Sequence, residues 1–73
     1  MTQIENIRLR MGMSRKDLAG ALETSEASLS RWERGQHYMP IYTAWRLIHL
    51  ARARRVGASL ERIYPDPTIG DEA

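Results

Sequence analysis

The sequence predicts a small all-α fold of five helices, and three observations support this prediction. Apolar residues recur at spacings of three and four through most of the chain, which is the period of an amphipathic helix. No stretch alternates apolar and polar residues over the length of a strand. Glycine and proline interrupt the apolar pattern at intervals that suit short helices. A chain of 73 residues is expected to form one domain.

The first helix is expected over residues 3–11, where Ile4, Ile7 and Met11 form a single apolar stripe. Gly12 should end this helix, because glycine readily adopts the left-handed conformation found at many helix ends. The N-terminal element is therefore expected to pack its stripe against the helices that follow.

The second helix should begin at Ser14, whose hydroxyl can cap the free amides of the first turn, with Asp17 completing an approximate capping box. Ser25 is a second N-cap residue, and it starts a third helix over residues 26–34 that Gly35 ends. The inner faces of these two helices are expected to carry the following residues: Leu18, Ala19, Leu22, Leu29 and Trp32.

Pro40 precedes a fourth helix, which is expected over residues 41–55 and ended by Gly57. Ser59 can cap a short fifth helix before two prolines end regular structure. The predicted apolar stripe of the fourth helix consists of Ile41, Ala44, Ile48 and Ala51, flanked by Trp45 and Leu47, and the fifth helix carries Leu60, Ile63 and Tyr64.

Charge is distributed unevenly along the chain. All eleven basic residues, ten of them Arg, lie at or before Arg62, together with six of the nine acids. The other three acids lie in residues 66–73, which we expect to form a short acidic, disordered tail after a folded domain at residues 1–65. Because Arg suits bidentate contact with phosphate and guanine, the basic domain favours a nucleic-acid partner.

Composition argues against several classes of protein. Cysteine is absent, and His37 and His49 lack acidic or thiol neighbours at metal-ligand spacing, so we expect neither a metal nor another cofactor. The sequence shows no nucleophile paired with a base and no glycine-rich phosphate loop, which argues against an enzyme. No apolar run approaches the ~18 residues of a membrane span, and we expect a cytoplasmic protein without membrane contact.

Residues 14–35 are the strongest functional signal, because they place two short helices on either side of a turn of about three residues. So short a turn makes the second helix cross the first steeply. If Leu29 and Trp32 face the core, the ~100° step per residue defines the opposite face. That face carries Ala27, Ser30, Arg31 and Arg34, with Glu26 and Ser28 beside it. It is polar and small enough to enter a DNA major groove ~12 Å wide.

This pattern resembles the Cro/repressor helix-turn-helix family, also called the XRE or lambda-repressor-like family. The similarity extends over residues 4–64, which is most of the chain. The residues that carry it are Arg8, Gly12-Met13-Ser14, Leu18-Ala19, Leu22, Ser25, Leu29-Ser30-Arg31-Trp32-Glu33, Gly35, Pro40 and the ending Ser59-Leu60-Glu61-Arg62-Ile63-Tyr64. The resemblance implies a compact five-helix lambda-repressor-like domain that binds DNA.

The resemblance also implies roles for individual residues. Glu26, Ala27 and Arg31 fall at base-reading positions, and the helical geometry adds Ser30 to that face. Arg15, Ser28 and Arg34 fall where phosphates are contacted, and Arg15 also braces the recognition helix. Arg8 and Glu33 match a pair that forms an internal salt bridge between the first and third helices.

The chemistry of the base-reading set agrees with these positions. Arg31 can donate to guanine O6 and N7, Glu26 can accept from cytosine N4, and Ala27 can contact a thymine methyl. The alternatives are that Arg31 is merely solvated and that Glu26 only complements the helix dipole.

One departure from the family pattern concerns the turn. Glu23 stands where the family commonly has glycine, and Thr24 stands where it commonly has a buried aliphatic residue. If the backbone at Glu23 requires a positive φ, that residue costs ~1 kcal/mol.

We expect double-stranded DNA as the partner, bound by a homodimer at two half-sites about one helical turn apart. The apolar candidates for the dimer interface are Trp45, Leu60, Ile63 and Tyr64. The leading hypothesis is therefore a Cro-like transcriptional repressor. The main alternative is an antitoxin-type protein-interaction module that binds DNA secondarily, with the tail as its partner-binding segment. RNA binding is a third hypothesis, which no aromatic platform supports.

Overall fold

The computed structural model describes residues 3–64, and within this range the chain is helical with no strand. The all-α prediction is therefore confirmed. The helices are α1 (Ile4–Arg10), α2 (Arg15–Ala21), α3 (Glu26–Glu33), α4 (Ile41–Ala53) and α5 (Leu60–Ile63). The first four are substantial helices, whereas α5 is a single turn of four residues. The predicted acidic tail at residues 66–73 lies outside the described residues.

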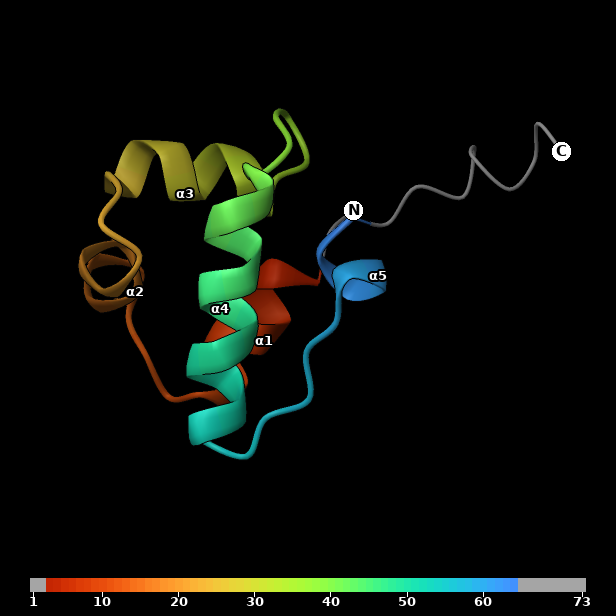
Figure 1. Cartoon of the computed structure of the whole chain (residues 1–73). Coiled ribbons are helices and arrows are strands. Elements are labelled where there is room, and N and C mark those ends of the chain that lie inside the picture. Colours follow the sequence, from red (N-terminus) through yellow and green to blue (C-terminus); the bar gives the residue numbers. More distant parts are fainter. Residues whose placement is uncertain (1–2, 65–73) are drawn as a thin grey trace, which may run out of the picture.

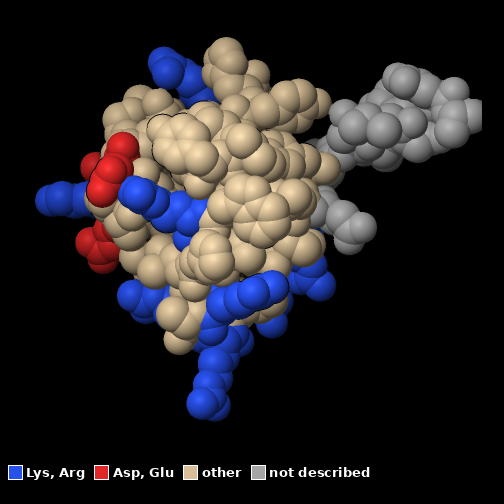
Figure 2. Space-filling model, in the orientation of Figure 1, with Lys and Arg blue, Asp and Glu red and all other residues tan. Residues whose placement is uncertain are grey.

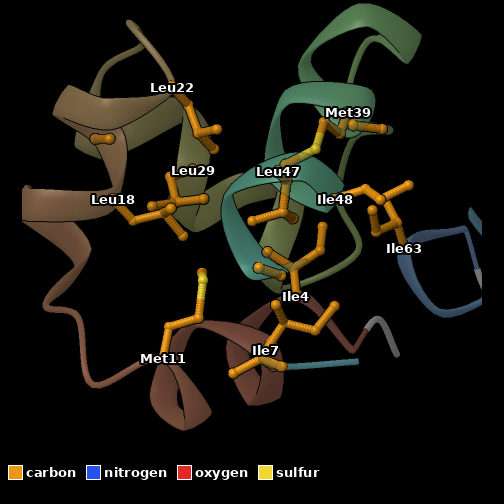
Figure 3. Packing of buried hydrophobic residues seen from close by; sticks show 14 residues of the cluster. Ile4, Ile7, Met11, Leu18, Leu22, Leu29, Met39, Leu47, Ile48 and Ile63 are labelled. Carbon is orange, nitrogen blue, oxygen red and sulfur yellow. The ribbon is translucent and has the colours of Figure 1, made fainter. Parts of the chain in front are cut away.

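The core lies around α4, which runs through the middle of the molecule with α1 behind it and α2 and α3 to one side (Figure 1). Figure 3 shows apolar side chains from every helix converging on this centre. The buried apolar residues are Ile4, Ile7, Met11, Leu18, Ala19, Leu22, Leu29, Met39, Ala44, Leu47, Ile48, Ala51, Val56 and Ile63. The stripes predicted for the first three helices thus contribute to one shared core.

The prediction for the inner face of α4 was wrong at two positions. Ile41 is 54% exposed, whereas Leu47 is fully buried. The buried residues of α4 are Thr43, Ala44, Leu47, Ile48 and Ala51. At ~100° per residue, the centre of this buried face lies about 90° around the helix from Ile41. The side chain of Ile41 therefore points along the flank of α4 and not into the core.

The four longer helices all end in the same hydrogen-bonding pattern, in which one residue with positive φ follows the C-cap. At the end of α1, Gly12 has φ 73°. The Met13 amide there donates to the Arg8 carbonyl over 3.2 Å. At the end of α3, Gly35 has φ 79°, and the Gln36 amide donates to the Arg31 carbonyl over 2.9 Å. These bonds satisfy carbonyls that the helix itself leaves free.

At the ends of α2 and α4 the same position is occupied by a residue other than glycine. Glu23 has φ 57° and Arg55 has φ 61°. The amide of Thr24 donates to the Ala19 carbonyl over 2.9 Å, and that of Val56 donates to the Ala51 carbonyl over 2.8 Å. The expectation that Gly57 ends the fourth helix was therefore wrong. The buried Val56 side chain follows the turn at Arg55 and fixes where α4 stops.

Two hydrogen bonds join the region of α5 to the rest of the fold. The Gln3 amide donates to the Arg62 carbonyl over 3.1 Å, which ties the start of α1 to α5. The hydroxyl of Tyr64 donates to the carbonyl of Met39, in the loop between α3 and α4. Partial burial raises the pKa of Tyr64 above its ordinary value of 10.0, because desolvation disfavours the charged phenolate.

Candidate nucleic-acid interface

Two capped helices and the turn between them form the candidate site. The Ser14 hydroxyl accepts a hydrogen bond from the Asp17 amide over 3.0 Å, so it caps α2 as predicted. The Ser25 hydroxyl likewise accepts from the Ser28 amide over 3.0 Å and caps α3. In Figure 1 α2 is seen nearly end-on while α3 lies across the page, which is a steep crossing. The turn leaves α3 at the edge of the molecule with one face outward.

The inward face of α3 is held by apolar packing and by charge. Leu29 is fully buried and contributes to the core. Trp32 is partly buried and packs against the same cluster. Glu33 is only 5% exposed although it carries a carboxylate. A buried carboxylate needs compensating partners, and two arginines from other helices supply them.

Glu33 joins α3 to both preceding helices. Arg8 Nε of α1 lies 2.7 Å from Glu33 Oε2, and Arg15 Nε of α2 lies 3.1 Å from Glu33 Oε1. Arg8 is itself buried and also donates from Nη1 to the Met13 carbonyl over 3.2 Å. The side chain of Arg15 remains 43% exposed. Arg8 also lies 4.0 Å from Glu5 through Nη2, so a cluster of two arginines and two carboxylates fixes the orientation of α3, with Arg15 at its solvent edge.

The outward face of α3 carries the residues predicted to read bases. Glu26, Ala27 and Arg31 are exposed, and Ser30 is half-buried. Among the described residues, none of these four side chains has a hydrogen bond or ion pair within the chain. Their polar groups are thus available to a partner that approaches α3 from outside.

The residues predicted to contact phosphate lie at both ends of α3. Ser28 is half-buried in its first turn, where its hydroxyl lies 3.1 Å from that of Ser25. Arg34 is the exposed C-cap residue. Arg15 comes close to this same end, because it bonds to Glu33, the residue before Arg34. Arg15 and Arg34 thus both lie toward the C-terminal end of α3, whereas Ser28 lies about 9 Å from Arg34 along the helix axis.

Other kinds of site find little support in the described part of the chain. No group of three His, Cys, Asp or Glu side chains that could hold a metal ion occurs among residues 3–64. The described helices include none long and apolar enough to cross a membrane. One open groove of about 310 Å³ lies beside α4 and α5. Its lining residues are Trp45, Ile48, Arg52, Ala58, Ser59 and Leu60.

The four residues expected at a dimer interface differ in exposure. Trp45 is 48% exposed, and Leu60 and Tyr64 are partly buried. Ile63 is only 1% exposed and belongs to the core, so its side chain offers no surface to a second copy, contrary to the expectation. The reason is that the single turn of α5 uses Ile63 to close the core against α4.

Sequence reasoning did not find every residue that shapes this region. The Arg15–Glu33 bond joins residues 18 positions apart, and no helical spacing indicates such a contact. Only the bracing role implied by the family resemblance pointed toward it. The pairing of Arg46 with Glu23 at 3.2 Å, between α4 and the turn after α2, was likewise not predicted.

Comparison with known proteins gave one match. A family model described as helix-turn-helix, of the Cro/C1 type, matches residues 4–49. The matched range begins at α1 and ends within α4, so it contains the whole of α2, the turn and α3. Searches of curated proteins and of solved structures gave no match.

Proposed function

Because the chain belongs to the helix-turn-helix family of the Cro/C1 type, we propose that it is a sequence-specific DNA-binding transcriptional regulator that acts as a Cro-like repressor. The observation that carries this proposal is the outward face of α3. Its exposed side chains, Glu26, Ala27 and Arg31, have no hydrogen bond or ion pair within the described chain, while its inward face is fixed by Leu29 and Glu33. A rigid helix with an uncommitted polar face is what major-groove reading requires.

In this proposal three side chains on the outward face of α3 each have a defined base contact. Arg31 donates to guanine O6 and N7, Glu26 accepts from cytosine N4, and Ala27 contacts a thymine methyl. Ser30 completes the base-reading set. These contacts give sequence preference because each base pair presents a different pattern of donors and acceptors in the major groove.

The phosphate contacts fix the register of α3 on the duplex. Arg15 and Arg34 lie at the C-terminal end of the helix, and Ser28 lies at its N-terminal end. Contacts at both ends set how far α3 enters the groove and carry no sequence information themselves. Glu33 links the position of α3 to the phosphate contacts, because it bonds to Arg15 and precedes Arg34 in the chain.

The proposed target is an operator with two half-sites about one helical turn apart, bound by two copies of the chain. One short recognition helix makes few base contacts and binds weakly by itself. Two copies double the number of contacts and so raise the affinity for the operator. Repression is the simplest outcome, because a bound dimer occupies the DNA that a polymerase needs. The expected site of action is the cytoplasm.

The first test is selection from random double-stranded DNA by the purified protein at about 150 mM salt, a concentration at which nonspecific phosphate contacts are weakened. We expect enrichment of a palindrome whose half-sites are about ten base pairs apart. Equal retention of all sequences would contradict sequence-specific reading.

A matched pair of variants then assigns the base contact. Arg31→Ala should relax the preference at a single base pair by about 1–3 kcal/mol. Arg52→Ala is the control, since it removes another exposed cation, from the last turn of α4, at the end of that helix away from α3 (Figure 1). Arg31→Ala would argue against base reading if it weakened binding to every sequence alike.

A further inference from the structure

The open groove beside α4 and α5 has the size of a site for a small molecule. Its volume of about 310 Å³ is at the low end of the ~300–1,000 Å³ that is typical of such sites. Three of its lining residues come from α4 and three from the segment that leads into α5; they are Trp45, Ile48, Arg52, Ala58, Ser59 and Leu60. We call it the α4–α5 groove. None of the six belongs to the base-reading or phosphate-contacting sets.

The body of the α4–α5 groove is apolar. Trp45, Ile48 and Arg52 are spaced three and four residues apart, so they share one face of α4. Ile48 is only 3% exposed and forms the floor, whereas Trp45 is 48% exposed. Ala58 and Leu60 are partly buried and pack against the core from the other side. An aromatic ring in this groove would contact apolar atoms on two sides, and it could pair with the Trp45 indole.

Two polar side chains line this apolar groove without a partner among the described residues. Arg52 is exposed, and its guanidinium makes no hydrogen bond or ion pair there. Ser59 is the half-buried N-cap residue of α5, yet its hydroxyl makes no capping bond. Because side chains on a helix lean toward its N-terminus, Arg52 reaches back toward Ile48 and Trp45. Both groups can therefore donate to a ligand in the groove.

The charge around the groove favours an anion. Residues 34–60, which include all six lining residues, contain five Arg and no Asp or Glu. Figure 2 shows the surface over the upper half of α4 largely without charge, with basic side chains gathered at the lower end. A guanidinium can donate two parallel hydrogen bonds to one carboxylate. Arg52 alone is charged among the described lining residues, so the groove matches a ligand with a single negative charge.

The walls of the groove are held in place by contacts within the chain. Val56 and Ile63, which flank the segment at residues 58–60, are 7% and 1% exposed and pack in the core. The Gln3 amide also bonds to the Arg62 carbonyl over 3.1 Å, which fixes α5 against the start of α1. A preformed groove loses little conformational entropy when a ligand binds, so more of the contact energy appears as affinity.

We propose that the α4–α5 groove binds an aromatic monocarboxylate of one or two rings. The ring lies beside Trp45 and over Ile48, and the carboxylate accepts hydrogen bonds from Arg52 and Ser59. This site lies outside α3 and goes beyond the proposed DNA binding, on which it does not depend. Because the groove is open and the ligand small, the dissociation constant should be roughly 0.1–1 mM.

The test is a titration of the full chain, without DNA, with 1-naphthoate up to about 10 mM, followed by proton–nitrogen correlation NMR. The chain has two tryptophans, so two indole signals report on it. The signal of Trp45 should shift and saturate, whereas that of Trp32, which packs against the core outside the groove, should stay in place. The amide 1-naphthamide has nearly the same shape and no charge, so it should bind at least ~10-fold more weakly.

Two variants assign the charge contact. Arg52→Gln should raise the dissociation constant of naphthoate at least ~10-fold and leave that of naphthamide unchanged. Arg55→Gln is the matched control, because it removes an equal charge three residues later, from a residue that does not line the groove. It should change the affinity for naphthoate by less than ~2-fold at about 150 mM salt. Both residues are exposed, so both variants should stay folded, and their amide spectra check this.

Each result decides the inference. A saturable shift of the Trp45 signal that is weakened in Arg52→Gln and kept in Arg55→Gln supports it. A Trp45 signal that does not saturate with naphthoate overturns it, and equal binding of naphthoate and naphthamide overturns it as well. If the Trp45 signal already shifts with protein concentration before ligand is added and naphthoate adds nothing, a second copy covers the groove and the inference is wrong. Because no DNA is present, failure of the DNA-binding proposal does not change these outcomes.

Discussion

Glu33 is the charged residue that ties α3 to both preceding helices. It is buried, and its two oxygens accept hydrogen bonds from Arg8 and Arg15, which come from different helices. The two arginines differ in environment, since Arg8 is 8% exposed and the Arg15 side chain 43%. Burial decides how much an ion pair contributes, because solvent screens an exposed pair and leaves a buried one nearly unscreened. The two bonds to Glu33 therefore differ in energy despite their similar lengths.

This difference predicts unequal losses of stability. Arg8→Ala removes the buried partner of a buried carboxylate, and should lower the free energy of unfolding by about 3–5 kcal/mol. Arg15→Ala should lower it by no more than ~1 kcal/mol. Urea denaturation followed by circular dichroism measures both. Equal losses for the two variants would contradict the assignment of Arg8 as the structural partner.

For individual residues, the sequence indicated which side chains are important better than it indicated which side chains contact one another. The Arg8–Glu33 pair followed only from the family resemblance, and the structure has it at 2.7 Å. Ile41 was misplaced because the apolar residues of α4 allow two neighbouring faces to be buried, and the face that the structure buries carries Ala44, Leu47 and Ala51. Ile63 was assigned to a dimer surface because the sequence does not distinguish an apolar residue that packs in the core from one that contacts a partner.

Among the elements, the ends of the helices are more uniform than their sequences indicate. Four helices end in one backbone pattern, yet glycine supplies the positive φ at only two of them. Gly12 and Gly35 were predictable as helix ends for this reason. Arg55 was not, because a long cationic side chain gives no local signal for a left-handed backbone. The position of Val56 in the core imposes it.

Glycine at these two unfavourable positions should stabilise the fold. Arg55→Gly removes the steric cost of φ 61° and should raise the free energy of unfolding by about 1 kcal/mol. Glu23→Gly should raise it by less, since that change also removes the exposed ion pair with Arg46, worth a few tenths of a kcal/mol. Thermal and urea unfolding measure both gains. As a control, Arg46→Ala removes the ion pair and leaves the backbone of the turn unchanged.

The link between α5 and the loop after α3 should be sensitive to alkali. Burial raises the pKa of Tyr64 above 10.0 in the folded state, so the folded protein holds that proton more tightly than the unfolded chain. The stabilisation is complete below the unfolded value of 10.0 and is lost as pH rises through the higher folded value.

The variant Tyr64→Phe tests this link. It should lose about 1 kcal/mol at neutral pH by removing the hydrogen bond to Met39. The difference in unfolding free energy between wild type and Tyr64→Phe should shrink as pH rises above 10.0. If the difference in unfolding free energy stays constant from pH 8 to 11, protonation of the Tyr64 phenol does not contribute to stability.

At the scale of the whole molecule, charge determines how binding responds to salt. The basic residues all lie at or before Arg62, and those assigned to phosphate lie at the C-terminal end of α3. Each cation that neutralises a phosphate releases bound counterions, so the logarithm of affinity falls with the logarithm of salt concentration by about 0.9 per contact. The salt dependence thus counts the phosphate contacts.

Arg34→Ala should lower the slope of this salt dependence by about one unit and weaken binding to all sequences equally. Arg52→Ala, at the far end of α4, should leave the slope unchanged. Fluorescence anisotropy of a labelled duplex between 50 and 300 mM salt measures both slopes. If both variants shifted the slope equally, the response would report overall charge and not contact at α3.

The overall architecture was the most predictable level, because helical periodicity and capping residues place the predicted ends of α1, α3 and α4 within two residues of the observed ones. The set of apolar residues that stay exposed was the least predictable. The exposure of Tyr38 and Tyr42 became evident only once the direction of the α4 face was known, since sequence alone gives no measure of what the rest of the chain leaves uncovered. The phase of a helix in a core depends on all its neighbours together.

The separation between the two faces of α3 has a consequence for how such a protein changes over generations. Glu26, Ala27 and Arg31 take no part in holding the domain together, whereas Leu29 and Glu33 do. If these three positions read bases as proposed, substitutions there should alter the preferred target while leaving the folding equilibrium nearly unchanged. A lineage can therefore move to a new operator through single changes, each producing a folded protein, and duplicated genes can diverge to independent targets without first acquiring extra stability.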